Sequence, residues 1–429
     1  MRTPRNRVTR VWRTRAVEWA CALSAMLLVG CASLPRRAAP PTLFSGATPV
    51  GFSSEVRFLS TDLASVQNHA AVGLQRLRRS SDDGFLRVLA LSGGGAGGAY
   101  GAGALVGLSR AHERPQYDLV TGVSAGALIA PFAFLGPEWD SQLTEAFTSG
   151  ADQRMSLHGL LAVPFGVKRR TAALHALVDH YVTRALINAV AKEAARGRVL
   201  WVATTDLDKA ETVIWDMGAI AARGGEPARR LFRDVLVASA SVPGVFSPVL
   251  IHVQEAGVSY DEMHVDGNAS TSLFVAPVAA YFALLDPHSL EGTQIFVLIN
   301  GRIIDAPETT PFRLAPIVSR TLSVALRHMA SAQVIAVDQF AEKYQMSLQS
   351  SYLPFDYPQY SPTDFRASAM QPLFAYGERC AQTGQLWTTI SETMGSVERA
   401  AAAPEGGRRG VKNLQCPLRR VELATVSGK

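Results

Sequence analysis

The sequence predicts an α/β protein whose central sheet is covered by helices on both faces. Its 429 residues are 48% hydrophobic and 18% charged, a composition that can bury a large core and excludes disorder for most of the chain. Between residues 85 and 300, short apolar runs alternate with longer segments of helical periodicity, which is the pattern of repeated strand–helix units.

The elements of this region follow from the same patterns. The predicted strands are residues 87–91, 119–121, 199–204, 212–215, 263–266 and 294–299. The predicted helices are residues 99–111, 125–134 and 231–240, and Pro131 is expected to kink the second helix or end it early. Apolar spacing predicts a further helix within residues 62–79, packed against this region, and a long helix within residues 317–345.

Glycines crowd the junction between the first predicted strand and the helix after it. Gly93, Gly94, Gly95 and Gly98 let backbone N–H groups turn toward a ligand, and the helix adds the positive end of its dipole. We refer to residues 92–98 as the glycine loop. Such a loop can hold a phosphate or the oxyanion of an acyl-transfer intermediate.

A serine lies at the next strand-to-helix junction, in the pentapeptide Gly122-Val123-Ser124-Ala125-Gly126. A serine between two glycines at such a junction can sit on a sharp turn with its hydroxyl exposed, as a nucleophile must. Further along, Asp266 ends a short predicted strand and is followed by Gly267, which permits close approach. The three motifs supply an anion-binding loop, a nucleophile and a carboxylate base.

Together these motifs resemble the patatin-like phospholipase family, through Gly93-x-Gly95-x-x-Gly98, Gly122-x-Ser124-x-Gly126 and Asp266-Gly267. The resemblance covers roughly residues 85–300, which we take as the catalytic domain, followed by a C-terminal extension, residues 301–429. It implies a three-layer α/β/α fold with a central, mostly parallel sheet and a mainly helical C-terminal extension.

The resemblance also implies an activity. It is that of a serine acyl hydrolase of lipids, of phospholipase A or lysophospholipase type. Ser124 would attack an acyl ester with Asp266 as general base, and the amides of Gly94 and Gly95 would be the main donors of the oxyanion hole. No metal or organic cofactor is expected for such a pair of residues.

Two residues depart from the family pattern. Gly97 stands where many members carry Lys or Arg, and Asn268 replaces the usual small residue after Asp-Gly. These departures leave open a non-catalytic outer-membrane lipoprotein on a hydrolase-like scaffold.

The same residues allow two other interpretations, a Ser–His hydrolase and a dinucleotide-binding fold. A Ser–His hydrolase could use His264, on the same face of its strand as Asp266, or His288 or His328. We expect His264 to be structural instead, because the position of Ser124 after only the second strand does not fit the usual α/β-hydrolase order. A dinucleotide-binding fold would use the glycine loop with Asp118 about twenty residues later, but it leaves Ser124 and Asp266 without a role.

The N-terminus predicts export. Six arginines and one glutamate in residues 1–30 precede or flank a short hydrophobic segment, residues 19–29, as in a signal peptide. The end of this segment, Leu28-Val29-Gly30-Cys31, resembles the lipobox of bacterial lipoproteins, with acylation of Cys31. Ala32 then implies the outer membrane. A plain signal peptide is the alternative. Residues 31–84 are expected to form a tether and one helix.

Charge and cysteines complete the expectations. Because the N-terminal arginines carry most of the formal charge of +6, the body is near neutral, and no nucleic-acid partner is expected. The cysteines have no metal-ligand spacing. In an oxidising compartment Cys380 and Cys416 are expected to form a disulfide, with two buried free thiols as the alternative.

Overall fold

A computed structural model of the chain describes residues 36–40, 46–81, 83–149, 163–275, 290–303, 309–354, 357–389 and 416. Cys31 and the predicted signal peptide lie outside these residues. The strands are β1 Thr48–Pro49, β2 Arg57–Leu59, β3 Arg87–Leu91, β4 Leu119–Val123, β5 Val199–Asp206, β6 Glu211–Asp216, β7 Val249–Glu255, β8 Val258–Asp266, β9 Gln294–Leu298 and β10 Ser347–Ser351. The α-helices are α2 Leu63–Ser80, α3 Gly98–Arg110, α4 Ala125–Leu135, α5 Asp140–Thr148, α6 Val163–Tyr181, α7 Arg184–Ala195, α8 Met217–Ala222, α9 Gly225–Ser239, α11 Leu314–Lys343 and α12 Ala367–Gln382.

The strands of the described chain form one sheet in the order β1-β7-β8-β5-β4-β3-β9-β10, with β6 and β2 branching from β5. The five strands β5, β4, β3, β9 and β10 are parallel to one another. The pairings of β8, β7 and β1, and of β6 and β2, are antiparallel. The expectation of a mostly parallel sheet therefore holds for its centre and is wrong for the half beyond β5.

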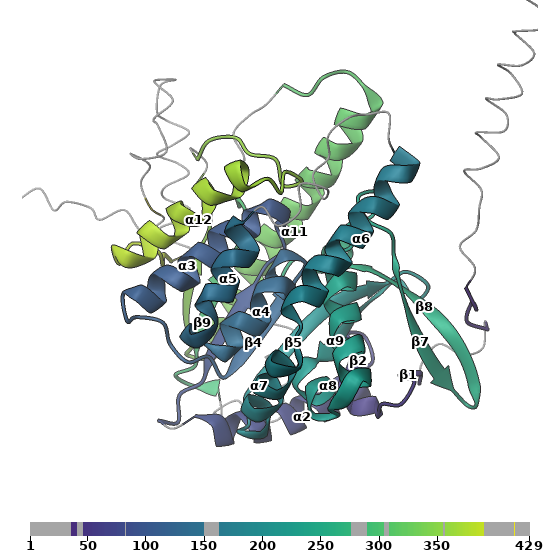
Figure 1. Ribbon diagram of the computed structural model, residues 1–429. Coiled ribbons are helices and arrows are strands. Elements are labelled where there is room, and N and C mark those ends of the chain that lie inside the picture. Colours follow the sequence, from purple (N-terminus) through teal and green to yellow (C-terminus); the bar gives the residue numbers. More distant parts are fainter. Residues whose placement is uncertain are drawn as a thin grey trace, which may run out of the picture.

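Helices cover both faces of the sheet, as Figure 1 shows. Because side chains alternate along a strand, β3 divides its residues between two cores: Leu89 and Leu91 face one side, and Val88 and Ala90 face the other. The first side is packed by α3, α4, α7, α9 and α12. The second is packed by α2 and α11. The α/β class and the three layers predicted from the sequence are confirmed.

The six predicted strands and the three predicted helices of the catalytic region all form, most with shifts of one or two residues at their ends, but β8 begins five residues and α9 six residues earlier than predicted. The main omission is β7, which pairs with β8 as a long antiparallel hairpin. The helix after Ser124 does not end at Pro131 but continues to Leu135.

The C-terminal extension is built onto the same sheet. The long helix α11 leads into β10, which pairs parallel with β9 at the edge. Beside it, α12 packs on α3, with the rings of Tyr100 and Tyr376 5.8 Å apart. The last turn of α12 holds Cys380, which forms a disulfide with Cys416. In the described part of the chain, every helix is too short or too polar to span a bilayer.

Candidate active site

Ser124 occupies the sharp turn between β4 and α4. Its backbone has φ 54° and ψ −121°, a region that a non-glycine residue rarely adopts. Two hydrogen bonds hold the turn in place. The Ser124 N–H donates to Ser239 Oγ at 3.0 Å, and that hydroxyl donates to the Ala203 carbonyl at 2.7 Å. A β-carbon on Gly126 would lie 2.4 Å from the Leu91 carbonyl, so only glycine lets the turn pack against the end of β3.

The Ser124 hydroxyl meets a carboxylate that comes from a distant strand. Asp266 ends β8, and its Oδ2 accepts a hydrogen bond from Ser124 Oγ at 2.6 Å. Its other oxygen, Oδ1, accepts the Asn268 N–H at 2.8 Å, which fixes the carboxylate plane. The two side chains belong to residues that are 3% and 1% exposed. The structure thus brings together two residues that are 142 positions apart.

Burial is the main influence on the acidity of Asp266. Removing water from the carboxylate raises its pKa to about 7, although the hydrogen bonds from Ser124 and Asn268 act in the opposite direction. A carboxyl group with a pKa near neutrality can take a proton from a bound hydroxyl and return it. An unperturbed aspartate is much too acidic for this work.

The glycine loop lies beside Ser124, but its amides are not equivalent. The Gly93 N–H donates to the Ser272 carbonyl at 3.2 Å, and the Gly98 N–H donates back into the loop. The amides of Gly94 and Gly95 have no acceptor among the described residues. The predicted donor set of four glycines is therefore reduced to these two, with Gly93 and Gly98 shaping the loop.

Two residues hold the glycine loop in place: Asn300, the last residue of the predicted catalytic domain, and Pro362, in the C-terminal extension. The Asn300 amide group donates to the Ser92 carbonyl at 2.6 Å, and the Pro362 carbonyl accepts the Ala96 N–H at 2.8 Å. A β-carbon on Gly97 would lie 2.2 Å from the Asn300 carbonyl and 2.9 Å from the Tyr360 hydroxyl. A basic side chain at position 97 has no room in this chain.

Asn268, the other departure from the family pattern, does two things. Its backbone N–H binds Asp266, as described above, and its side-chain amide lies over Gly93, where a β-carbon would come within 1.9 Å of Nδ2. Asn268 therefore lies between the Asp-Gly turn and the glycine loop. The hydrogen bond of the Ser124 hydroxyl goes to Asp266 instead.

A deep apolar cavity opens at Ser124. The empty space among its wall residues, open solvent at its mouth included, is about 950 Å³, and the wall is formed largely by α4, α6 and α9. Two of its wall residues, Phe365 and Met370, come from the C-terminal extension. The remaining wall is almost entirely apolar; it includes Leu128, Pro131, Phe132, Phe147, Leu174, Leu177, Val178, Tyr181, Leu186, Leu236 and Phe246. The cavity matches a long hydrocarbon chain better than a polar ligand.

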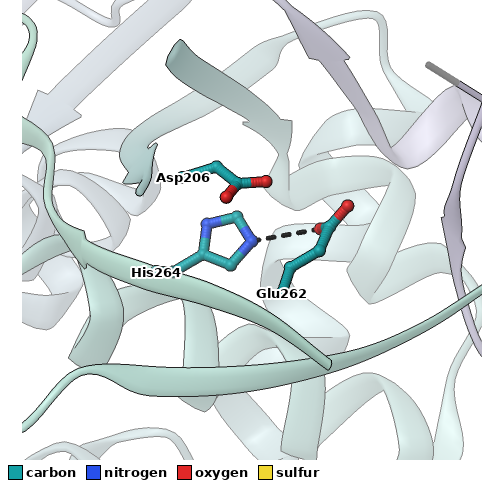
Figure 2. Close-up of side chains that lie close together, drawn as sticks. All are labelled: Asp206, Glu262 and His264. Atoms are coloured by element: carbon teal, nitrogen blue, oxygen red, sulfur yellow. Dashed lines mark hydrogen bonds and ion pairs between the residues drawn. The ribbon is translucent and has the colours of Figure 1, made fainter. Parts of the chain in front are cut away.

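A second polar cluster lies close by on β5 and β8 and consists of Asp206, Glu262 and His264 (Figure 2). One ligand atom from each lies within 4.8 Å of the others, a geometry that could suit a metal ion. Two cations already occupy it, however: Arg57 binds Glu262, and Lys209 binds both carboxylates. Burial would raise the pKa of Glu262, but the charge of Arg57 and the hydrogen bonds hold it well below its usual range. Glu262 thus has cationic partners on both oxygens, whereas Asp206 Oδ2 is buried without a hydrogen bond, 3.3 Å from Lys209 Nζ.

His264 is committed to this cluster. Its Nδ1 is 2.9 Å from Thr204 Oγ1 and its Nε2 is 3.2 Å from Glu262 Oε2, so both ring nitrogens have partners other than Ser124. It is fully buried, with Trp215 against its ring. This arrangement agrees with a structural role. Of the other two histidines considered, His328 lies on α11 and His288 is outside the described residues.

Asp118 cannot serve a dinucleotide. It precedes β4, at the opposite end of the strand from the glycine loop, and its carboxylate accepts hydrogen bonds from Ser80 Oγ and the Arg87 N–H at 2.8 and 2.9 Å. Asp118 therefore connects α2 to β3 through these hydrogen bonds. Its position about twenty residues after the glycine loop has this structural explanation.

Three supporting residues were not identified from the sequence. Ser239 lies near the end of the predicted helix 231–240, and Asn300 comes two residues after β9, on the glycine-loop side of the sheet. For Ser239 and Asn300, these positions in the sequence were the signals that could have indicated a role at the site. Pro362 acts through its carbonyl oxygen, a group that every residue has, so no sequence pattern could have found it.

Comparison with known proteins agrees with these observations. Residues 89–278 match the family model of patatin-like phospholipases. A "cUMP-AMP-activated phospholipase" of Escherichia coli is 31% identical over 175 residues, which are 40% of this chain and 45% of that protein. The chain thus matches less than half the length of this curated relative.

Two solved structures show distant likeness. VipD from Legionella pneumophila is 12% identical, with a TM-score of 0.32 over 70% of this chain and 67% of that chain. The human GIVD cytosolic phospholipase A2 is 10% identical, with a TM-score of 0.28 over 66% and 51%. The family match and the curated relative support a lipid hydrolase activity.

Proposed function

Because residues 89–278 match the patatin-like phospholipases, we propose that this chain is a serine acyl hydrolase that cleaves acyl esters of membrane lipids. The observation that carries the proposal is the hydrogen bond from Ser124 Oγ to the buried Asp266 carboxylate, at the mouth of an apolar cavity. Phospholipids and lysophospholipids are the substrate class that such a cavity favours.

The reaction begins when Asp266 Oδ2 takes the hydroxyl proton and Ser124 Oγ bonds to the ester carbonyl carbon. The oxyanion that forms is bound by the amides of Gly94 and Gly95. The tetrahedral intermediate then collapses, and the leaving alkoxide takes the proton from Asp266. Water repeats the same steps on the acyl-enzyme, with Asp266 as the base, and releases the fatty acid.

The surroundings of the pair support these roles. The strained turn holds the Ser124 hydroxyl in place before substrate arrives, so little reorganisation is needed in the transition state. Each oxyanion donor of this type contributes on the order of 3 kcal/mol to transition-state stabilisation. The apolar wall excludes water from the acyl chain.

The direct test is incubation of the purified protein with a total bacterial envelope lipid extract, with released fatty acids followed by mass spectrometry. Ser124→Ala should abolish release. Ser109→Ala, which removes a hydroxyl that donates to the Leu105 carbonyl and accepts from Arg114 Nη1 away from Ser124, is the matched control and should leave it intact. A fluorophosphonate probe should label the parent protein at Ser124. Absence of both label and fatty acid in the folded protein would instead favour a non-catalytic lipoprotein.

We also propose that the protein is held at the outer membrane through acylated Cys31, on the basis of the N-terminal sequence alone. Anchoring would keep the site beside its substrate at high local concentration. Metabolic labelling with a palmitate analogue tests this: the label should enter the parent protein and be lost in Cys31→Ser. Equal labelling of both would exclude the anchor.

A further inference from the structure

The helix α11 is far longer than the strands it connects. Its 30 residues extend about 45 Å, whereas β9 and β10, with five residues each, extend about 17 Å. Because β9 and β10 are parallel, the connecting helix must run antiparallel to both. Its C-terminal end lies at the start of β9, where the Gly292 N–H donates to the Gln345 carbonyl at 3.1 Å. The excess length therefore extends beyond the other ends of the strands.

Those other ends form the edge of the sheet where Ser124 and the glycine loop lie. The middle of α11 contacts this edge directly: Ser272 Oγ donates to the Leu326 carbonyl at 3.3 Å, and the Ser272 carbonyl accepts the Gly93 N–H. Leu314 comes 12 residues before Leu326, or about 18 Å along the helix. Figure 1 shows this end of α11 rising clear of the body, on the side away from α2.

Burial along α11 agrees with this geometry. Ala330, Val334, Val337 and Ala341, all in its second half, are buried against the sheet. In the first half, large apolar side chains face solvent instead. Leu314, Val318 and Leu322, at successive i, i+4 positions on one face, are 79%, 57% and 47% exposed, and Phe312 just before the helix is 99% exposed. We call these four residues the apolar stripe.

The charge of the same segment has one sign. Residues 309–337 contain three arginines and no aspartate or glutamate. Arg313 is exposed between Phe312 and Leu314, whereas Arg320 and Arg327 are partly buried, have contacts of their own and lie on the side of the helix away from Val318 and Leu322. A helix that combines exposed apolar side chains with basic residues is suited to the interface of a bilayer that carries anionic lipids.

We propose that the apolar stripe, with the exposed Arg313 beside it, forms a docking surface for anionic phospholipid bilayers. It would hold the active-site edge against the lipid from which substrate is taken. The purpose of this surface rests on the proposed hydrolase function, but the docking itself does not require catalysis, so the two can be tested separately.

The binding test uses the full-length chain with Cys31→Ser, which removes the proposed acyl anchor, and Ser124→Ala, which keeps the lipid intact. The protein is mixed at low salt with vesicles of phosphatidylethanolamine that contain about one-third phosphatidylglycerol, and the fraction that sediments with the vesicles is measured. Leu314→Gln, Val318→Gln and Leu322→Gln together should weaken binding at least tenfold. Leu63→Gln with Val72→Gln on α2, which removes side chains 59% and 50% exposed, is the matched control and should bind like the parent.

Two further measurements complete the test. Binding should fall as salt is raised and should be weaker to pure phosphatidylcholine, because the charge of Arg313 contributes. With Ser124 restored, the stripe variant should hydrolyse a soluble short-chain ester at the parent rate but release less fatty acid from vesicles. If no protein hydrolyses the soluble ester while docking depends on the stripe, the proposed function fails and the docking surface stands.

The proposal is overturned if the stripe variant binds anionic vesicles as tightly as the parent, or if the α2 control weakens binding equally. It is also overturned if the parent proves to be a dimer that the stripe variant converts to a monomer, because the surface would then belong to a second copy. Circular dichroism and the soluble-ester rate establish that each variant is folded.

Discussion

Replacing Asp266 by Asn should stabilise the fold at alkaline pH while it abolishes ester hydrolysis. Burial raises the pKa of this carboxyl from 3.8 to about 7, so between these values the folded protein retains a proton that the unfolded chain releases. Stability therefore falls as pH rises from about 4 to 7, and above pH 7 the full penalty is present. About 3 pKa units at ~1.4 kcal/mol each give ~4 kcal/mol. Asparagine avoids this cost and can still accept the Asn268 N–H.

The assay is thermal and urea denaturation of parent and variant at pH 5 and pH 8, together with the pH profile of kcat/KM for the parent. The variant's advantage should be larger at pH 8, and kcat/KM of the parent should rise through about pH 7 as Asp266 ionises. Asp261→Asn on the same strand is the control. Burial would raise the pKa of Asp261, but its hydrogen bonds with Arg37 and His252 lower it, so its loss should destabilise at pH 8. If Asp266→Asn does not raise the stability of the protein at pH 8, the argument that burial raises the pKa of Asp266 is wrong.

Three other predictions concern the same site. Ser239→Ala leaves the Ser124 N–H without its acceptor, so kcat should fall about tenfold to a hundredfold with little change in KM, which steady-state kinetics on a soluble ester will measure. His264→Ala should retain much of the esterase activity of the folded protein, whatever it costs in melting temperature; a loss as complete as that of Asp266→Asn would establish a Ser–His mechanism. Leu177→Trp should fill part of the cavity and lower the rate on long-chain esters relative to butyrate esters, and equal effects on both would show that the acyl chain binds elsewhere.

The residues predicted from the sequence are those whose role demands a particular residue type in a particular local order. A serine on a sharp turn needs glycine beside it, and an anion-binding loop needs several glycines, so Ser124 and the glycine loop were visible as motifs. Which glycine amides remain available could not be predicted, because the Gly93 N–H is satisfied by Ser272, 179 positions away, through tertiary packing alone.

The strand β7, in the antiparallel half of the sheet, was not predicted for a related reason. In β7, Val249, Ile251 and Val253 are buried while His252 and Gln254 are exposed, so the period-two signal was present. It is interrupted by polar residues on the open face, unlike the continuous apolar runs of the buried parallel strands. Attention to alternation, rather than to apolar runs, would have found it.

The site is completed by residues that lie outside the region matched to the family. Residues 89–278 contain Ser124 and Asp266, but the glycine loop is held by Asn300 and by the Pro362 carbonyl. Phe365 and Met370 add a wall to the cavity, and α12, which carries Met370, is fixed on α3. The proposed nucleophile and its proposed base thus belong to the part of the chain that matches the family, whereas the shape of the apolar cavity and the position of the glycine loop depend on the C-terminal extension. Differences in substrate preference between this protein and its relatives should therefore follow the extension, and a chain cut after β9 should lose the geometry of the glycine loop even though Ser124 and Asp266 remain.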